Sequence, residues 1–376
     1  MRCHHRFLCL FIPSLLTLVV QSAVAKEVKT LKINAPAPEL NLPGIDDKTY
    51  RLDDFADARV LVVIFTCNHC PTAQAYEKRI IRLHADYRDK GVSLVAISPN
   101  DPLAVRLDEL GYTDIGDSFE DVKRHAKRRG FKFPYLYDGE TQRVSTAFGV
   151  LATPHVFIFD RQRKLRYNGR IDDADIKPPK SHDARNAIDD LLAGRPVRVP
   201  KTRVFGCSTK WADKRDSVKK SIEKWNAEPV ELKQIDESGL RELAANKTEN
   251  YRLIKLWSTT CVPCITELPE FVTINRMYRR RHFEMYTLTT DPPGRQDAAL
   301  KVLRNNHVSC TNYIFDSDDR DQLAEALDSH WEGPVPYTIL IAPGGKIVRR
   351  WKDEIDPDEL KTEISNRLGK TYASRK

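Results

Sequence analysis

The sequence lacks a long apolar run, a short tandem repeat and a strong charge of either sign, and each absence excludes a class of protein. Its N-terminal apolar stretch, Phe7–Val20, is shorter than the roughly 20 residues of a membrane-spanning helix, and Pro13 interrupts it. With 41% hydrophobic residues and no low-complexity segment, neither a disordered chain nor a solenoid is expected. The formal net charge is +8 over 376 residues, so basic clusters such as 279–281 are interpreted as solvated surface. We therefore expect globular domains and no nucleic-acid partner.

The N-terminus has the pattern of a secretory signal peptide. Arg2 and Arg6 precede the apolar stretch, and Ala23-Val24-Ala25 follows it. We expect a signal peptide over residues 1–25, with an uncleaved membrane anchor as the alternative. Export predicts a periplasmic or other extracytoplasmic location, where disulfides persist.

Two Cys-x-x-Cys motifs each follow an apolar, strand-like run. Cys67 and Cys70 come after residues 61–65, and Cys261 and Cys264 come after residues 253–257. Helical spacing follows both motifs, which predicts that each pair lies at a helix N-terminus, where the helix dipole favours the thiolate. Cysteines at this spacing close a small disulfide ring and cycle between dithiol and disulfide. Zinc binding is the alternative for such a pair.

The strand and helix signals divide the chain into two halves with the same plan. Each half has a buried strand, the cysteine pair, a helix, a second strand and an antiparallel hairpin, which predicts a mixed α/β fold. The predicted limits are a first domain over residues 33–195, a linker over 196–229, a second domain over 230–368 and a basic tail over 369–376.

A proline precedes the hairpin strand in both halves. These prolines are Pro154, after Thr153, and Pro336, after Val335. Proline is allowed at the first residue of a strand and is rare within one. With the cysteine pairs, these prolines give both halves a resemblance to thioredoxin-fold domains in tandem. The resemblance implies that each proline loop lies beside its cysteine pair and binds the incoming peptide.

The second half resembles TlpA-like thioredoxins through Trp257, Cys261, Pro263, Cys264, Glu267 and Pro269. The resemblance implies that Cys261 is the exposed nucleophile, that Cys264 resolves the mixed disulfide and that Trp257 lines the substrate site. Glu267, one helical turn after Cys264, is expected to handle protons, with a surface glutamate as the alternative.

The first half resembles the alkyl hydroperoxide reductase and thiol-specific antioxidant branch of this fold, through its Ala-Pro-x-x-x-Leu opening at residues 35–40. Thiol peroxidase activity is therefore one alternative. The branch's Pro-x-x-x-Thr-x-x-Cys arrangement is missing, because Val63 stands at the proline position and Cys67 at the threonine position before Cys70. We therefore expect disulfide exchange in this half as well.

His69 lies immediately before the second cysteine of the first pair. A cationic imidazole there is expected to favour the Cys67 thiolate and to make the disulfide more oxidising, with a neutral solvent-facing histidine as the alternative. With His155 beside the proline loop, a copper or zinc carrier is a further alternative.

A lone cysteine, Cys207, lies in the linker, and it is interpreted either as a resolving thiol or as a silent buried one. Together these features predict an exported thiol-disulfide oxidoreductase that acts on protein thiols and disulfides. We expect no cofactor other than the redox-active disulfides Cys67–Cys70 and Cys261–Cys264, and no resident metal. A membrane electron donor or acceptor is a possible partner.

Overall fold

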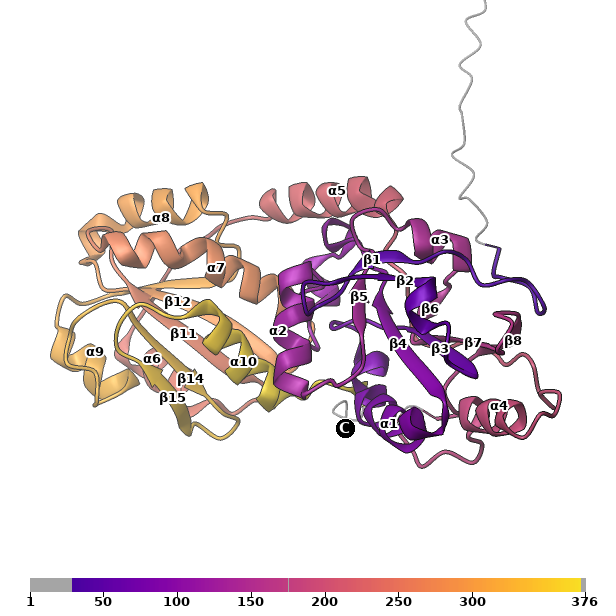
Figure 1. Ribbon diagram of the computed structural model, residues 1–376. Helices are drawn as coiled ribbons and strands as arrows, with labels where there is room; N and C mark the ends of the chain where they lie inside the picture. The colour runs from indigo at the N-terminus through magenta and orange to yellow at the C-terminus, as the bar shows by residue number, and fades with distance from the viewer. Residues whose placement is uncertain (1–28, 175, 373–376) are drawn as a thin grey trace, which may run out of the picture.

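The computed structural model describes residues 29–174 and 176–372, which form two α/β domains side by side (Figure 1). The predicted signal peptide over residues 1–25 and the last four residues of the predicted tail lie outside these residues. Within the described part of the chain, no helix has both the length and the apolar character that a membrane crossing requires. The predicted domain limits stay predictions.

The first domain is built on a five-stranded sheet in the order β5-β4-β3-β7-β8. β3 is parallel to β4 and antiparallel to β7. Its helices and strands are β1 (Asn41–Pro43), β2 (Thr49–Arg51), β3 (Val60–Phe65), α1 (Pro71–Tyr87), β4 (Val92–Ser98), α2 (Phe119–Arg129), β5 (Tyr135–Tyr137), α3 (Arg143–Phe148), β6 (Ala152–Thr153), β7 (His155–Phe159), β8 (Leu165–Gly169) and α4 (Asp183–Leu192).

The central strand β3 is buried on both faces, as its unbroken apolar sequence predicts. Because side chains alternate along a strand, Val62 and Ile64 pack with α1, α2 and α4, while Leu61 and Val63 pack with α3 and the N-terminal segment. These two cores fix the position of the end of β3, and the first cysteine pair begins two residues after it.

The segment between the domains is folded onto both of them. It contains β9 (Cys207–Ser208), which pairs with β6 of the first domain, and α5 (Arg215–Asn226), which lies over the contact between the domains. Arg215 at the start of α5 binds Asp101 of the first domain at 2.5 Å. Near its other end, Trp225 lies under the guanidinium groups of Arg276 and Arg279 of the second domain. The linker is therefore a packed element and not a loose tether.

The second domain has a six-stranded sheet in the order β10-β13-β12-β11-β14-β15. Helices α6 and α9 cover one face, and α7, α8 and α10 cover the other. Its elements are β10 (Lys233–Ile235), α6 (Glu237–Ala245), β11 (Tyr251–Trp257), α7 (Val262–Tyr278), β12 (Phe283–Thr289), α8 (Gln296–Asn305), β13 (Thr311–Phe315), α9 (Arg320–Leu327), β14 (Tyr337–Ile341), β15 (Ile347–Trp351) and α10 (Pro357–Leu368). Both predicted hairpins are present, and the predicted fold class is confirmed.

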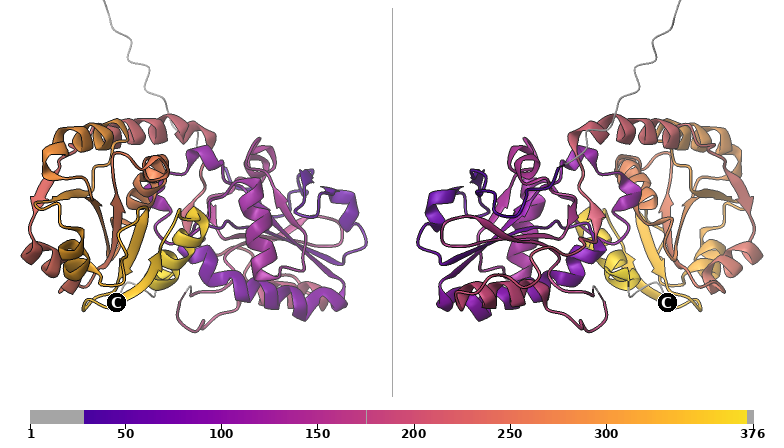
Figure 2. Two further views of the ribbon diagram at one scale, coloured as in Figure 1. Left: turned by 90° about the vertical axis from the view of Figure 1, so that its left-hand side faces the viewer. Right: turned by 90° about the vertical axis from the view of Figure 1, so that its right-hand side faces the viewer.

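Hydrogen bonds and ion pairs join the two domains, and some of the side chains that make them are buried. Two views at right angles to Figure 1 show the lobes as distinct bodies (Figure 2). At their junction, the hydroxyl of Tyr278 at the end of α7 donates to the carbonyl of Thr113 at 2.7 Å. Asp114, with a side chain only 3% exposed, accepts from Arg128 of its own domain and from Thr362 and Lys370 of the other.

The change Asp114→Asn is expected to lower the free energy of unfolding by about 1–3 kcal/mol, because charged hydrogen bonds across the junction are weakened. Urea denaturation of the full chain measures this loss. The matched control is Asp358→Asn, since Asp358 also pairs across the junction, with Arg124, but both side chains are 50% exposed. For the control we expect a loss below about 1 kcal/mol. Equal losses would contradict the larger contribution that we expect from the buried Asp114.

Candidate functional site

The first cysteine pair lies in the loop between β3 and α1, and its second cysteine caps the helix. Cys70 is the residue before α1, and its Sγ accepts a hydrogen bond from the amide of Ala73 at 3.5 Å. Pro71 occupies the first helical position, where its missing N–H leaves no group unsatisfied. Cys67 lies three residues earlier in the loop, and both thiols are buried, at 3% and 0% exposure for Cys67 and Cys70.

Asp117 pins this loop from the segment before α2. Its carboxylate accepts hydrogen bonds from the backbone amides of Asn68 and His69, from the Asn100 side chain at 2.7 Å and from Nδ1 of His69 at 2.5 Å. Burial alone would lower the pKa of His69, but the charge of Asp117 raises it above the ordinary value. Burial alone would raise the pKa of Asp117, and the His69 charge lowers it. The contact with Asp117 therefore favours the protonated imidazole, which is buried and does not face solvent.

The lowered thiol pKa belongs to Cys70 and not to Cys67, which corrects the expectation from sequence. Burial alone would raise the pKa of Cys70, but hydrogen bonds from the thiols of Cys207 and Cys67, together with the nearby His69 charge, hold it well below the ordinary value. Burial raises the pKa of Cys67, whose thiol donates to Cys70. Because Cys70 caps the helix, it also lies at the positive end of the helix dipole.

The Thr153–Pro154 loop lies against both thiols, as the proline placement predicts. Sγ of Cys67 is 3.0 Å from Oγ1 of Thr153, and Sγ of Cys70 is 3.4 Å from the Thr153 carbonyl oxygen. The Thr153–Pro154 peptide bond is cis. Cys207 of the linker packs against the cluster of Cys67, Cys70 and Ala73, and its amide donates to Sγ of Cys70. The structure therefore brings together predicted residues from three distant segments.

The group Cys67, His69 and Asp117 has ligand atoms within 4.8 Å of one another. These residues do not suit a metal ion well, because four hydrogen-bond donors already occupy the two oxygens of Asp117. His155 does not join them. Its Nε2 lies 2.8 Å from Asn168, its Nδ1 accepts from the Leu151 amide, and burial lowers its pKa to about 4.

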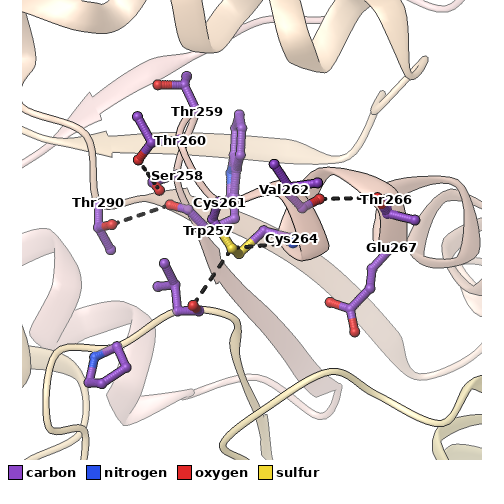
Figure 3. The surroundings of a disulfide bond; sticks show 12 residues. Trp257, Ser258, Thr259, Thr260, Cys261, Val262, Cys264, Thr266, Glu267 and Thr290 are labelled. Atoms are coloured by element: carbon purple, nitrogen blue, oxygen red, sulfur yellow. Dashed lines mark hydrogen bonds between the residues drawn. A yellow bond between two sulfur atoms is a disulfide. The ribbon is translucent and has the colours of Figure 1, made fainter.

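The second cysteine pair is placed differently relative to the start of its helix. Cys261, the first cysteine, is the residue before α7, and it is bonded to Cys264 (Figure 3). Cys261 is partly exposed next to Val262, which is 73% exposed, whereas Cys264 is fully buried. Of the two predicted disulfides, this one is present, while Cys67 and Cys70 are free thiols.

The Val335–Pro336 loop lies beside the disulfide, with Sγ of Cys261 3.6 Å from the Val335 carbonyl oxygen. Asp291 pins the loop before α7 by accepting from the amide and hydroxyl of Thr259. Trp257 is fully buried among the side chains under α7 and α8, so the prediction that it lines the substrate site is wrong. Its position at the end of β11 directs it into the core.

Glu267 lies on the same helix as Cys264 (Figure 3), but its carboxylate is already engaged. One oxygen pairs with the buried Lys255 ammonium group, and the other accepts from the amide of Ile355 at 2.5 Å. Burial lowers the pKa of Lys255, against the opposing effect of Glu267. A proton relay through Glu267 would have to release one of these contacts.

The aspartates 117 and 291 and the lysine 255 were not among the residues predicted from the sequence. Each aspartate holds the loop that carries a cysteine pair, Asp117 from the segment before α2 and Asp291 from the segment after β12. Asp291 lies two residues after the end of β12, where side chains of parallel strands converge, and this position is the signal that identifies it.

A comparison with protein families gives a match over residues 33–168 to the AhpC/TSA family. Residues 33–168 are an AhpC/TSA-family domain. The predicted resemblance of the first half is thereby confirmed, and the loop with Cys67 and Cys70 falls within the AhpC/TSA-family domain. No curated protein matches the chain.

Solved structures similar to the chain are known from several bacteria. An uncharacterized conserved protein from Geobacillus kaustophilus is 38% identical, with 48% of this chain and 92% of that chain covered and a TM-score of 0.43. A hypothetical protein from Sinorhizobium meliloti is 32% identical, with 49% and 97% covered and a TM-score of 0.44. The thioredoxin domain of a thiol-disulfide oxidoreductase from Bacteroides vulgatus is 16% identical, with 37% and 89% covered and a TM-score of 0.31.

Proposed function

We propose that this protein is a thiol-disulfide oxidoreductase that exchanges disulfides with protein substrates. The observation that carries the proposal is the disulfide between the partly exposed Cys261 and the buried Cys264 at the start of α7. A compartment that preserves disulfides, as predicted from the sequence, suits this activity. The TlpA-like character of the second domain is part of this proposal.

The exposures of the two sulfurs assign the roles. A reduced Cys261 attacks a substrate disulfide, which forms a Cys261 mixed disulfide and releases one substrate thiolate. Cys264 then attacks Sγ of Cys261, closes the Cys261–Cys264 bond and releases the second substrate thiolate. The reverse sequence oxidises a substrate dithiol. The amide of Cys264, which donates to Sγ of Cys261 at 3.2 Å, stabilises charge on that sulfur when it is a thiolate.

Trapping of a mixed disulfide tests this assignment. With a disulfide-bonded peptide as substrate, the full-chain Cys264→Ser variant is expected to accumulate the peptide on Cys261, because no second thiol releases it. Mass spectrometry of the tryptic fragment 256–276 locates the adduct. Cys261→Ser is expected to give no adduct on this fragment, and Cys310→Ser, which changes a cysteine of neither pair, is expected to behave like the parent protein. Absence of the adduct in Cys264→Ser would contradict the proposal.

Thiol peroxidase activity at Cys70 is the second candidate function. The AhpC/TSA match and the lowered pKa of Cys70 favour it. In such a reaction the Cys70 thiolate attacks a peroxide oxygen, becomes a sulfenate and releases water or an alcohol. Sulfenate trapping on the tryptic fragment 60–78 after addition of peroxide distinguishes this activity from exchange with a disulfide.

A further inference from the structure

The linker runs through the first domain's site as an added strand. β9 pairs with β6 in antiparallel register, with Cys207 opposite Thr153 and Ser208 opposite Ala152. Thr153 is the residue directly before Pro154 and contacts both Cys67 and Cys70. An extended segment that adds to a free strand edge is a general mode of peptide binding. Here the added peptide is part of the chain itself.

Gly206 permits the close approach of this segment. Its φ is +147°, and a Cβ at this position would lie 2.1 Å from the carbonyl oxygen of Thr153. A side chain at residue 206 would therefore push the strand away from the loop. The glycine lies directly before the cysteine that must reach the site.

Cys207 makes two contacts with Cys70. Its amide donates to Sγ of Cys70 at 3.4 Å, and its thiol forms a hydrogen bond with the same sulfur. This bond and burial raise the pKa of Cys207, while the pKa of Cys70 is lowered. The two cysteines are therefore in contact, and the directions of their pKa shifts favour the thiolate on Cys70 over one on Cys207.

Of the three clustered cysteines, Cys207 is the one that is partly exposed. Cys67 and Cys70 are 3% and 0% exposed, and Cys207 is partly exposed. The second domain differs, because none of the described residues pairs with Val335 as an added strand. A substrate therefore meets Cys261 directly in the second domain, but meets Cys207 before Cys70 in the first.

We propose that Cys207, and not Cys67, is the exchange partner of Cys70, and that β9 serves as a built-in peptide in the first domain's site. This inference rests on the proposed function, since it assigns the reacting pair of the first domain. It predicts that an incoming thiol or disulfide reacts at Cys207.

The chemistry of the pair is consistent with this order. A substrate thiolate attacks Sγ of Cys207 in a Cys70–Cys207 disulfide, and Cys70 leaves as the thiolate. Attack at this sulfur is favoured because Cys207 is partly exposed while Cys70 is buried, and departure of Cys70 is favoured by its lower pKa. A second substrate thiol then releases Cys207 as a thiolate and forms the substrate disulfide. The pair is reoxidised by the reverse steps with a disulfide-bearing partner, which becomes two thiols.

Disulfide mapping of the full chain tests the pairing. The protein is equilibrated in glutathione buffers of graded potential, alkylated and digested with trypsin. A Cys70–Cys207 bond joins fragments 60–78 and 204–210, whereas a Cys67–Cys70 bond stays within fragment 60–78. We expect most oxidised Cys70 to be joined to fragment 204–210, in the parent protein and in Cys67→Ser alike. A majority of Cys67–Cys70 bonds, or loss of the joined fragments in Cys67→Ser, would overturn the proposal.

The variant Gly206→Val separates the role of the strand from that of the thiol. This variant retains all three cysteines. We nevertheless expect about a tenfold fall in the amount of fragment 60–78 joined to fragment 204–210 at the same potential, because the backbone of β9 no longer approaches Thr153. Unchanged joining in Gly206→Val would overturn the role given to β9. Lys201→Ala, at an exposed linker position, is the control.

The same digests report separately on the proposed function. Reversible closure of Cys261–Cys264 without the Cys70–Cys207 bond would overturn this inference alone. Failure of Cys261–Cys264 to open and close at any potential would instead overturn the proposed function.

Discussion

The change Glu267→Gln is expected to lower the free energy of unfolding by about 3–5 kcal/mol, because it leaves a buried ammonium group without a counter-charge. The Lys255 side chain is fully buried and that of Glu267 is 10% exposed, so water compensates little for the lost carboxylate. Glu267 also accepts from the amide of Ile355, which joins α7 to the segment after β15. Urea denaturation at neutral pH measures the loss.

The pH dependence of this loss has a definite sign. Burial already lowers the pKa of Lys255 below its ordinary 10.5 in the parent protein, and removal of the Glu267 charge lowers it further. The unfolded chain then binds more protons than the folded one between the folded pKa and 10.5, so the stability of the variant rises with pH through that range. The difference in free energy of unfolding between Glu267→Gln and the parent protein is therefore expected to become smaller as the pH rises into the alkaline range.

Two variants complete this experiment. Glu270→Gln, one helical turn away and 46% exposed at its side chain, is the control, for which a change within about 0.5 kcal/mol is expected. The double change Lys255→Met with Glu267→Gln is expected to recover part of the stability, because it removes the unpaired charge as well. A loss in Glu267→Gln no larger than in Glu270→Gln would show that the buried pair contributes little.

Local sequence patterns predicted most of the fold because the decisive strands are nearly uniform in character. Residues 61–65 are apolar throughout, and residues 253–257 are apolar except for Lys255. Such strands belong at the centre of a sheet covered on both faces. Pro154 and Pro336 then place the antiparallel hairpins. The short strand β9 carried no such signal, since two residues have no periodicity, and it forms only because β6 offers it a free edge.

The candidate site was less predictable, because its energetics depend on contacts between distant segments. His69 was identified from its neighbours in sequence, but Asp117, 48 residues away, raises its pKa. The two cysteine pairs have the same spacing in sequence, but they differ in position relative to the start of the following helix. The helix begins after the second cysteine in the first domain and after the first cysteine in the second. The lowered pKa therefore belongs to Cys70, although the position of His69 in the sequence predicted a favoured thiolate at Cys67.

Asp117→Asn is the change with the largest expected effect on the first domain. It removes the counter-charge of a fully buried imidazole, and a cost of about 3–5 kcal/mol is expected from the loss of one partner of a buried pair. Because the folded pKa of His69 is raised above 6.5, its contribution is complete below 6.5 and is lost as pH rises through the folded pKa. Because the folded pKa of Asp117 is lowered below 3.8, its contribution is lost only as pH falls through that folded value. The difference in free energy of unfolding between the parent protein and Asp117→Asn is therefore expected to be largest between pH 3.8 and 6.5.

The same change is expected to raise the pKa of Cys70, because a neutral His69 no longer favours the thiolate. Thiolate absorbance followed against pH in the full chain measures this, since the closed Cys261–Cys264 bond contributes no thiolate. Glu120→Gln, with a side chain 78% exposed, is the control, and it is expected to alter neither the absorbance curve nor the stability by more than about 0.5 kcal/mol. If Asp117→Asn destabilises the protein but leaves the absorbance curve unchanged, Asp117 shapes the loop without setting the charge at Cys70. The thiolate would then depend on the helix N-terminus and on the thiols of Cys67 and Cys207.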